Sequence, residues 1–235
     1  MVRADADAPG AAAAVIASTT GFILRTRPLT DTSIIVHWLT ADLGRVATVA
    51  RGARRPKSPF AGKLDLFYRC DLSFSRSRSS ELHTLREVSL CETHAALRRD
   101  LSALQQAAYA VAWLEQTTET ETPLPGLYRL FSDWLQHVAA APITPHLIFG
   151  LELKFLNELG LGPDLAAARL SPGARAIALR WAALDWLSAA GCLPSHAQAT
   201  ELRQFLHDCL IYHLGRIPRG REAALTASSG EGSNA

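Results

Sequence analysis

The first third of the chain carries its apolar residues in short runs. Between Thr20 and Leu90 these runs are rich in β-branched and aromatic side chains and are separated by turn-forming residues, a pattern typical of β-strands. The run SIIVHWLT, which starts at Ser33, is almost continuously apolar and predicts a strand buried on both faces. We expect five strands, at residues 21–27, 33–40, 45–51, 64–74 and 81–90.

The fourth expected strand alternates between apolar and other residues. Since successive side chains of a strand point to opposite faces, its apolar residues should share one face: Leu64, Leu66, Tyr68, Cys70, Leu72 and Phe74. Five strands within about 70 residues match the size of an OB-type barrel. An SH3-like barrel is the alternative.

After Leu90 the apolar residues recur with the 3.6-residue period of helices. The first helix is expected at 94–117. Thr144 and Ser171 each precede a proline, as an N-cap residue followed by proline at the first helical position does, and therefore predict two helix starts. Three apolar sets mark the second helix, the helix after Ser171 and the last helix: Leu127, Leu130, Phe131, Trp134, Leu135 and Val138; Trp181 and Trp186; and Leu202, Phe205, Leu206, Cys209 and Leu210.

The change of period predicts an α+β protein. A five-stranded OB-fold barrel is expected at residues 20–91, followed by an all-helical C-terminal domain at residues 92–226. A flexible extension at 1–19 and a disordered tail at 227–235 complete the expected organisation.

Composition limits the environment of the chain. Of its 235 residues 48% are hydrophobic, but no apolar run approaches the roughly 20 residues that cross a bilayer. The alanine-rich start holds Asp5 and Asp7 where a signal peptide needs positive charge. Four cysteines lie far apart without a CxxC pair, which favours buried reduced thiols: Cys70, Cys91, Cys192 and Cys209. We therefore expect a cytoplasmic protein without a membrane partner.

Charge is distributed unevenly along the chain. The whole sequence has a formal net charge of +2, whereas the segment from Gly21 to Arg86 holds 12 basic and 5 acidic residues, a net charge of +7. The remainder therefore carries −5. A basic N-terminal module joined to a mildly acidic one suggests that the first module meets a polyanion.

The densest basic segment is RGARRPKSPFAGK, which runs from Arg51 to Lys63 between two expected strands. Guanidinium groups pair bidentately with phosphate oxygens, and neutralising phosphates releases counterions from nucleic acid. The loop SRSRSS and the turn at 27–31 are the last and first interstrand loops of an OB barrel, which commonly grip oligonucleotides. A solvated loop is the alternative interpretation. The basic residues concerned are Arg27, Arg51, Arg54, Arg55, Lys57, Lys63, Arg76 and Arg78.

Three aromatic residues near these loops could stack on bases. They are Phe60, Phe67 and Tyr68. Because the expected alternation puts Tyr68 in the core, Phe60 is the more available. Nothing in the segment predicts base-sequence specificity.

Catalytic constellations are missing from the sequence. It contains no GxSxG elbow, no Walker A loop and no HExxH, and its eight histidines are scattered. His37 and His83 lie within expected strands, where a structural role is favoured. The chain is therefore not expected to be an enzyme.

A family likeness follows from these same residues. The string LRTRPLTDTSIIVHWLTADLGRVATVARGARRPKS at 24–58, followed by FAGKLDLF and ELHTLREVSL, closely resembles the N-terminal domain of the RecO family of bacterial DNA repair proteins. A weaker likeness continues through LELKFLNELGLGPDL, RLSPGARA and YHLGRIPRGRE, so that it covers roughly residues 21–222.

The resemblance implies a recombination mediator with an OB-fold and a helical C-terminal domain. Such a protein binds single- and double-stranded DNA, anneals complementary strands and, with RecR, helps load RecA onto DNA coated with single-strand-binding protein. It would use no cofactor and would be associated with the nucleoid. From the matching motif, the resemblance implies that the following residues bind DNA: Arg27, Arg45, Arg51, Arg54, Arg55 and Lys57, with Lys63 and Arg86 as additions.

The resemblance also implies that the helical domain captures the C-terminal tail of single-strand-binding protein, at a pocket the match leaves unassigned. Many members carry a four-cysteine zinc-binding insertion that would fall at residues 162–170. This interval is short and contains no cysteine, so no metal is expected. The helical domain should then depend on apolar packing, including Trp181 and Trp186.

Two other classes of protein fit the same features. An RNA-binding module would use the same barrel and charges, since nothing marks recognition of a 2′-hydroxyl. A protein-interaction scaffold would dock an acidic partner on the basic face.

Overall fold

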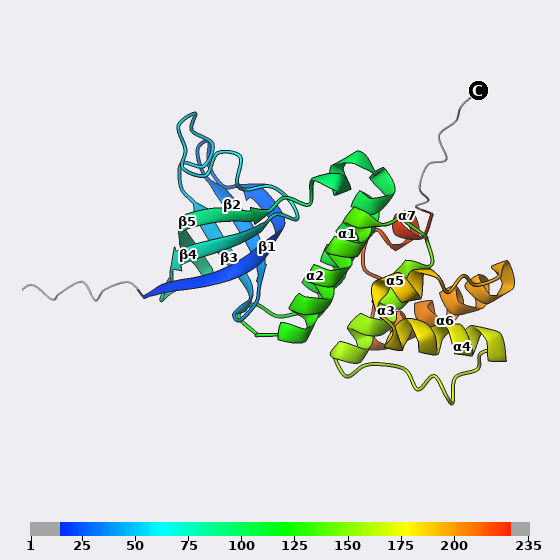
Figure 1. Ribbon diagram of the computed structural model, residues 1–235. Helices are drawn as coiled ribbons and strands as arrows, with labels where there is room; N and C mark the ends of the chain where they lie inside the picture. The colour runs from blue at the N-terminus through cyan, green and yellow to red at the C-terminus, as the bar shows by residue number, and fades with distance from the viewer. Residues whose placement is uncertain (1–14, 227–235) are drawn as a thin grey trace, which may run out of the picture.

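The computed structural model describes residues 15–226. The predicted tail at 227–235 and most of the predicted extension lie outside the described residues. The described chain forms a barrel followed by helices, and α1 (Leu101–Thr117) and α2 (Pro125–Ala140) lie between the barrel and the remaining helices (Figure 1).

Five strands close into a barrel in the order β1-β2-β3-β5-β4. β3 and β5 pair in parallel, and the other neighbours are antiparallel. This confirms the predicted OB-type barrel. Its strands are β1 Ile16–Pro28, β2 Ile34–Thr40, β3 Gly44–Ala50, β4 Arg69–Ser75 and β5 Leu82–Glu92.

The strands bury two different faces. Inside the barrel, Ile23, Trp38 and Phe74 are fully buried, and the Trp38 indole donates to Thr48 Oγ1 at 2.9 Å. On the outer side of β1 and β2, Phe22 and Leu39 pack into the core of the helical domain. Because β2 has apolar partners on both sides, its nearly continuous apolar run is explained.

Within residues 15–226, the helical domain consists of η1 and seven α-helices. An Asp100 carboxylate caps α1, accepting from the Ser102 amide at 2.7 Å. The predicted N-cap at Ser171 is confirmed, since its hydroxyl accepts from the Ala174 amide at 3.3 Å. The remaining bounds are η1 Ala95–Arg99, α3 Leu147–Glu158, α4 Pro172–Ala183, α5 Trp186–Ala190, α6 His196–Leu214 and α7 Arg221–Thr226.

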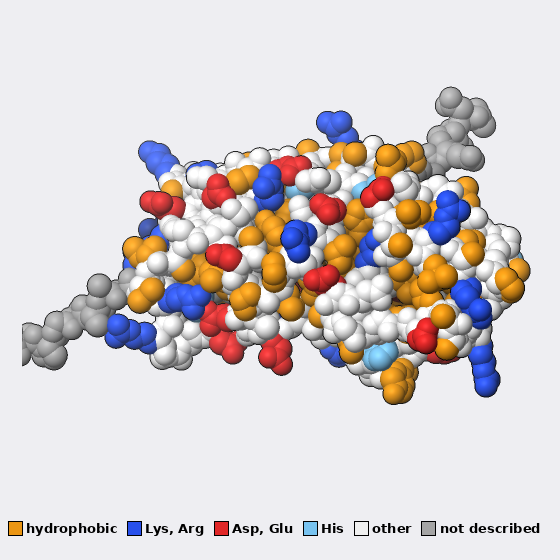
Figure 2. All heavy atoms as spheres, turned by 60° about the horizontal axis from the view of Figure 1, so that its bottom comes forward, with side chains coloured by type: hydrophobic (Ala, Val, Ile, Leu, Met, Phe, Trp, Pro, Cys, Tyr) orange, Lys and Arg blue, Asp and Glu red, His pale blue; other side chains and the backbone are white. Residues whose placement is uncertain are grey.

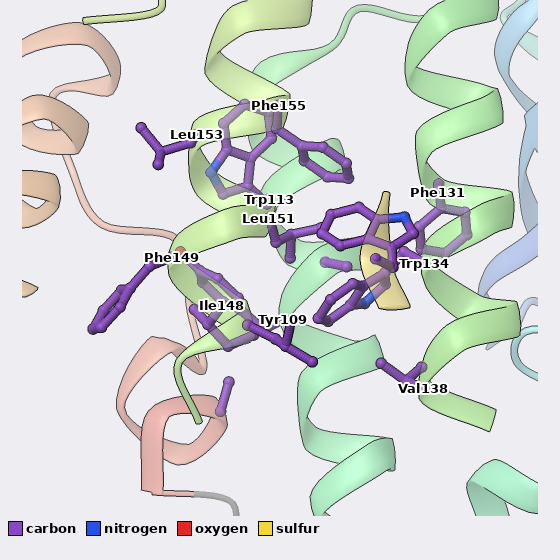
Figure 3. Packing of buried hydrophobic residues seen from close by; sticks show 14 of the residues in the cluster. Tyr109, Trp113, Phe131, Trp134, Val138, Ile148, Phe149, Leu151, Leu153 and Phe155 are labelled. Atoms are coloured by element: carbon purple, nitrogen blue, oxygen red, sulfur yellow. The ribbon is translucent and has the colours of Figure 1, made fainter. Parts of the chain in front are cut away.

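Large aromatic rings fill the helical core (Figure 3). Trp113 meets Phe155 edge to face with ring centroids 4.9 Å apart, and Trp134 meets Trp186 in the same way at 4.8 Å. Such pairs add about 1 kcal/mol each beyond the area that they bury. The core therefore depends on apolar packing across α1, α2, α3 and α5.

One buried ion pair fastens the C-terminal helix. Arg221 of α7 donates to both carboxylate oxygens of Glu152 in α3, at 2.7 and 2.9 Å, and Tyr109 of α1 donates to the same carboxylate at 2.6 Å. Burial, followed by the Glu152 charge, raises the pKa of Tyr109 well above its usual value. The pair joins three helices that are far apart in sequence.

The predicted strand at 64–74 is wrong in its first half. Residues 64–68 are not part of a strand; a turn falls at 66–67, with Phe67 at φ 65°, and β4 begins at Arg69. The left-handed backbone at Phe67 breaks the alternation, because it allows the Phe67 amide to donate to the Ile23 carbonyl at 2.8 Å. Leu66 is consequently 37% exposed.

Four other boundaries differ from the prediction. β1 begins at Ile16, so residues 16–19 belong to the barrel rather than to an extension. α3 begins at Leu147, after a turn in which the Leu147 amide donates to the Thr144 carbonyl, and Thr144 is therefore not its N-cap. Trp181 and Trp186 occupy separate helices, because Asp185 caps α5 through the Ser188 amide. The expected helix at 94–117 is broken at Asp100 into η1 and α1.

Among the described helices none combines the length and the apolar character that a membrane span requires. Within residues 15–226, no group of three or more His, Cys, Asp or Glu side chains is placed to hold a metal ion.

Candidate nucleic-acid interface

The outer face of β1, β2 and β3 carries a row of arginines. Cross-strand partners point to the same side of a sheet, and Arg25 is the partner of His37, just as Arg27 is the partner of Ile35. Arg45 is the partner of Leu39 and shares its face. The face of strands 2 and 3 is the surface with which OB-folds bind oligonucleotides.

His37 reports the electrostatics of this face. Its pKa is lowered from 6.5 to about 4, most strongly by burial and then by the charges of Arg25, Arg27 and Arg45, in that order. Its Nε2 atom is buried without a hydrogen-bond partner among the described residues. A neutral imidazole therefore lies among three guanidinium groups, whose combined potential favours an anion.

A groove of about 660 Å³ lies between the β3–β4 loop (51–68) on one side and the β4–β5 loop (76–81) with β5 on the other. Three arginines line it, namely Arg51, Arg76 and Arg86. The Arg86 guanidinium donates to Ser75 Oγ at 2.7 Å, which orients it along the groove wall.

A second groove of about 480 Å³ lies between β3 and the β1–β2 loop (29–33). It is lined by Thr30, Ser33, Arg51 and Arg55, among others. Since Arg51 lines both grooves, they meet at this residue. The two grooves together present basic side chains from the β3–β4 loop, the β4–β5 loop and β5.

The β3–β4 loop is built from consecutive turns that fix its basic residues. The Arg55 amide donates to the Gly52 carbonyl at 3.0 Å, and Gly52 has a φ of 71° that suits glycine. The Arg54 amide donates to the Thr32 carbonyl at 3.0 Å, and this bond joins the loop to the β1–β2 loop. Phe60 anchors the far side of the loop in the barrel core, where it is 7% exposed.

The β4–β5 loop is fastened by His83, which the sequence predicted to be structural. His83 is buried and stacks on Phe74 with ring centroids 5.0 Å apart. Its Nδ1 accepts from the Ser77 amide at 3.2 Å, and its Nε2 lies 3.1 Å from Glu121. Glu121 also pairs with Arg76 at 3.2 Å, so the base of the loop is held against the segment that follows α1.

Most of the predicted basic residues have no acidic partner. Some arginines elsewhere on the molecule are paired, as Arg69 is with Glu92 and Arg98 with Asp65. Within residues 15–226, seven exposed basic residues form no ion pair with a described carboxylate: Arg27, Arg51, Arg54, Arg55, Lys57, Arg78 and Arg86. Cations that are free of acidic partners are available to neutralise phosphates.

The face seen in Figure 2, which turns the bottom of Figure 1 toward the viewer, differs in character. Blue basic and red acidic side chains are interspersed over both domains there, with apolar side chains between them. Neither positive nor negative charge predominates on this side of the molecule.

Two predicted site residues are held by other protein atoms. Arg45 is half-buried and donates through Nε to Thr118 Oγ1 at 2.7 Å, so it faces the helical domain. Lys63 is partly buried, and its ammonium donates to the Val88 carbonyl at 3.3 Å. Both are already engaged by protein atoms, in contrast to the arginines of the loops.

The predicted stacking role of Phe60 is wrong, because the side chain is buried in the barrel. Tyr68, expected in the core, is partly buried and packs against the barrel core, and the Arg98 guanidinium lies 4.9 Å from its ring centroid. Phe67 is 3% exposed and packs in the helical core. The positive φ at Phe67 interrupts the strand, but Leu64 and Tyr68 still pack against the barrel core.

Sequence reasoning missed Arg25 and His37 as members of the basic face. Arg25 lies two residues before Arg27 on the same strand, so alternation could have placed it on the face. It missed Arg216 and Arg219 as well, which lie beside Arg25 and Arg45 in a groove between the two domains. No local signal connects residues so far apart in sequence.

Two protein-family models match the chain, one over the barrel and one over the first part of the helical domain. The family model described as "Recombination protein O N terminal" matches residues 15–94, and that described as "Recombination protein O C terminal" matches residues 98–168. The first match coincides with the barrel and the second with η1 to α3.

Curated relatives match over the same region. The DNA repair protein RecO of Exiguobacterium sibiricum is 30% identical over 145 residues, which are 62% of this chain and 57% of that protein. DNA repair protein RecO of Symbiobacterium thermophilum is 36% identical over 152 residues (63% and 58%), and that of Bacillus subtilis 29% over 145 residues (62% and 56%). The matched part thus spans somewhat more than half the length of these relatives.

The fold and the basic face define an OB-type barrel protein with an attached helical domain. With both family models matching in order, the chain belongs to the RecO family.

Proposed function

We propose that this chain is a DNA repair and recombination mediator that binds single- and double-stranded DNA and anneals complementary strands. The observation that carries the proposal is the pair of grooves that meet at Arg51, edged by exposed basic residues without acidic partners. The printed names of the relatives, DNA repair protein RecO, support the same role.

The proposed mechanism involves no covalent chemistry. Guanidinium groups of the loops neutralise the phosphates of two strands, which removes the repulsion that opposes their approach. The bases stay free to pair, because the arginines bind the backbone rather than base edges. Annealing then proceeds without hydrolysis and without a cofactor.

The helical domain supplies the protein contacts in this proposal. The chain acts in the cytoplasm at the nucleoid, where it works with RecR and binds the C-terminal tail of single-strand-binding protein. RecA is loaded indirectly, once the coated strand has been engaged. These partners rest on family membership and on no contact in the structure.

Binding to a labelled single strand across a salt series tests the proposal. The triple variant R54A/R55A/K57A should bind more weakly and with a smaller salt slope, since each lost phosphate contact on a single strand removes about 0.7 from the slope, or about 2 in total. The charge-matched control is R99A/R129A/R180A, which removes three exposed arginines of the helical domain.

Equal affinity and slope for the two triple variants would refute the assignment of the loops. A matched RNA strand in the same assay separates the classes, because tighter binding to RNA than to DNA would favour the RNA-binding module.

A further inference from the structure

A groove of about 390 Å³ lies at the junction of the barrel and the helical domain. Arg25 of β1 and Arg45 of β3 line one side, while Ala112, Glu115 and Gln116 of α1 form the floor. The connection between α6 and α7 closes the other side with Arg216 and Arg219. Segments from the beginning and the end of the described chain therefore meet here.

The groove is built from side chains held in place. The Arg45 guanidinium donates to both the hydroxyl and the carbonyl oxygen of Thr118. Arg25 Nε lies 3.1 Å from Glu115 Oε1. Gln116 donates to the Arg216 carbonyl at 2.8 Å. These contacts fix both walls of the groove.

The connection that carries Arg216 and Arg219 is anchored at both ends. Gly215 terminates α6 with a φ of 71°, and its amide donates to the Ile211 carbonyl at 2.9 Å. At the other end, the buried pair of Arg221 with Glu152 fastens α7 to α3. The two arginines are thus presented on a fixed segment, although their side chains are exposed.

Positive charge exceeds negative charge in this groove. Four guanidinium groups face a single carboxylate, that of Glu115, which is engaged by Arg25. Arg216 and Arg219 pair with no carboxylate within residues 15–226. Like charges held together favour an anion between them, and guanidinium forks suit phosphate oxygens.

The groove also continues the basic face of the barrel. Arg25 and Arg27 are two residues apart on β1, about 7 Å along the strand, and point to the same side. Arg45 lies on the outer face of β3, opposite Leu39 of β2. A strand that leaves the β1–β2 loop groove along this face therefore reaches the junction next.

We propose that the junction groove is a second phosphate-binding site, which takes the sugar–phosphate backbone of single-stranded nucleic acid as it passes from the barrel to the helical domain. This inference rests on the proposed function and extends it. The helical domain then contributes directly to strand binding through Arg216 and Arg219. The length of strand engaged exceeds what the barrel alone can cover.

Binding of oligothymidines of two lengths to the full chain tests the site. A strand of ~6 nucleotides fits an OB-fold alone, whereas one of ~25 nucleotides extends beyond it. The variant R216Q/R219Q should bind the long strand about tenfold more weakly, with a salt slope lower by about 1.4, and the short strand as the unchanged protein does. The control R99Q/R180Q removes two exposed arginines elsewhere on the helical domain and should leave both affinities unchanged.

Each other outcome contradicts the proposal in a distinct way. Unchanged binding of both lengths by R216Q/R219Q would refute the junction site while leaving the barrel interface in place. Equal weakening for both lengths would show that the arginines act on the barrel site, not on a second one. Failure of the unchanged protein to bind either strand would refute the proposed function itself. Tighter binding of an acidic peptide than of the long strand, lost in the double variant, would assign the groove to a protein.

Discussion

His37 lies where three arginines and the burial of its ring all disfavour its charged form. Its pKa falls from 6.5 to about 4 in the folded protein, and burial also lowers the pKa values of His94, His137 and His146. Below pH 6.5 the unfolded chain takes up protons that the folded chain does not. The free energy of unfolding should therefore fall as the pH drops from 6.5 toward 4.

The variant H37Q tests this linkage. Each pKa unit corresponds to about 1.4 kcal/mol, so that His37 accounts for at most about 3 kcal/mol of the stability lost by pH 4. H37Q should therefore lose less stability than the unchanged protein between pH 7 and pH 4, as measured by urea unfolding at each pH. The matched control is H196Q, which removes an exposed histidine. Identical pH profiles for H37Q and the unchanged protein would contradict the placement of His37.

At the scale of elements, the tight turn between β2 and β3 sets the distance between the barrel and the segment that follows α1. Gly44 has a φ of 71°, and a Cβ placed there would lie 2.0 Å from the Thr122 carbonyl oxygen. The Glu121 amide donates to the Arg45 carbonyl at 2.8 Å beside it. Only glycine allows this close approach.

Replacing Gly44 by alanine should separate these two segments. The control G62A changes a glycine with the same φ of 71° but with nothing within 4 Å, so it measures backbone strain alone, about 1 kcal/mol. G44A should cost at least about 2 kcal/mol more than G62A in urea unfolding, because backbone atoms must move as well. Similar losses in both variants would show that the approach to Thr122 is not rigid.

The elements also show what sequence patterns can and cannot predict. Alternation and the 3.6-residue period identified the barrel and the main helices, because burial of one face governs both. The strand at 64–74 failed because Phe67 takes a left-handed conformation, which is unusual for a bulky residue and carries no sequence signal. α7 was missed because its stability derives from Arg221 and Glu152, a contact between distant segments.

One part of the candidate site could also be predicted from the sequence, and another part could not. The loops that hold Arg54, Arg55 and Arg78 were predictable from local charge density and from strand order. The junction groove was not, because Arg25 and Arg45 meet Arg216 and Arg219 only after the two domains pack.

At the scale of the whole molecule, residues on the outer side of the barrel are part of the hydrophobic core of the helical domain, while the barrel interior forms a core of its own. Phe22 meets Phe131 edge to face at 5.4 Å, and Leu24 and Leu39 are buried in the same cluster. The basic face and the helical surface are therefore held in a fixed relation. Under the proposed function, a strand held on the barrel face stays close to any protein bound by the helices.

The most direct test of this account is annealing of two complementary labelled oligonucleotides coated with single-strand-binding protein. The unchanged chain should accelerate annealing, and the acceleration should decline with rising salt, since the contacts are with phosphates. R54A/R55A/K57A should lose most of the acceleration, and R99A/R129A/R180A should retain it. No acceleration by the unchanged chain at low salt, or equal acceleration by both triple variants, would contradict the claim that the basic loops of the barrel bring two strands together.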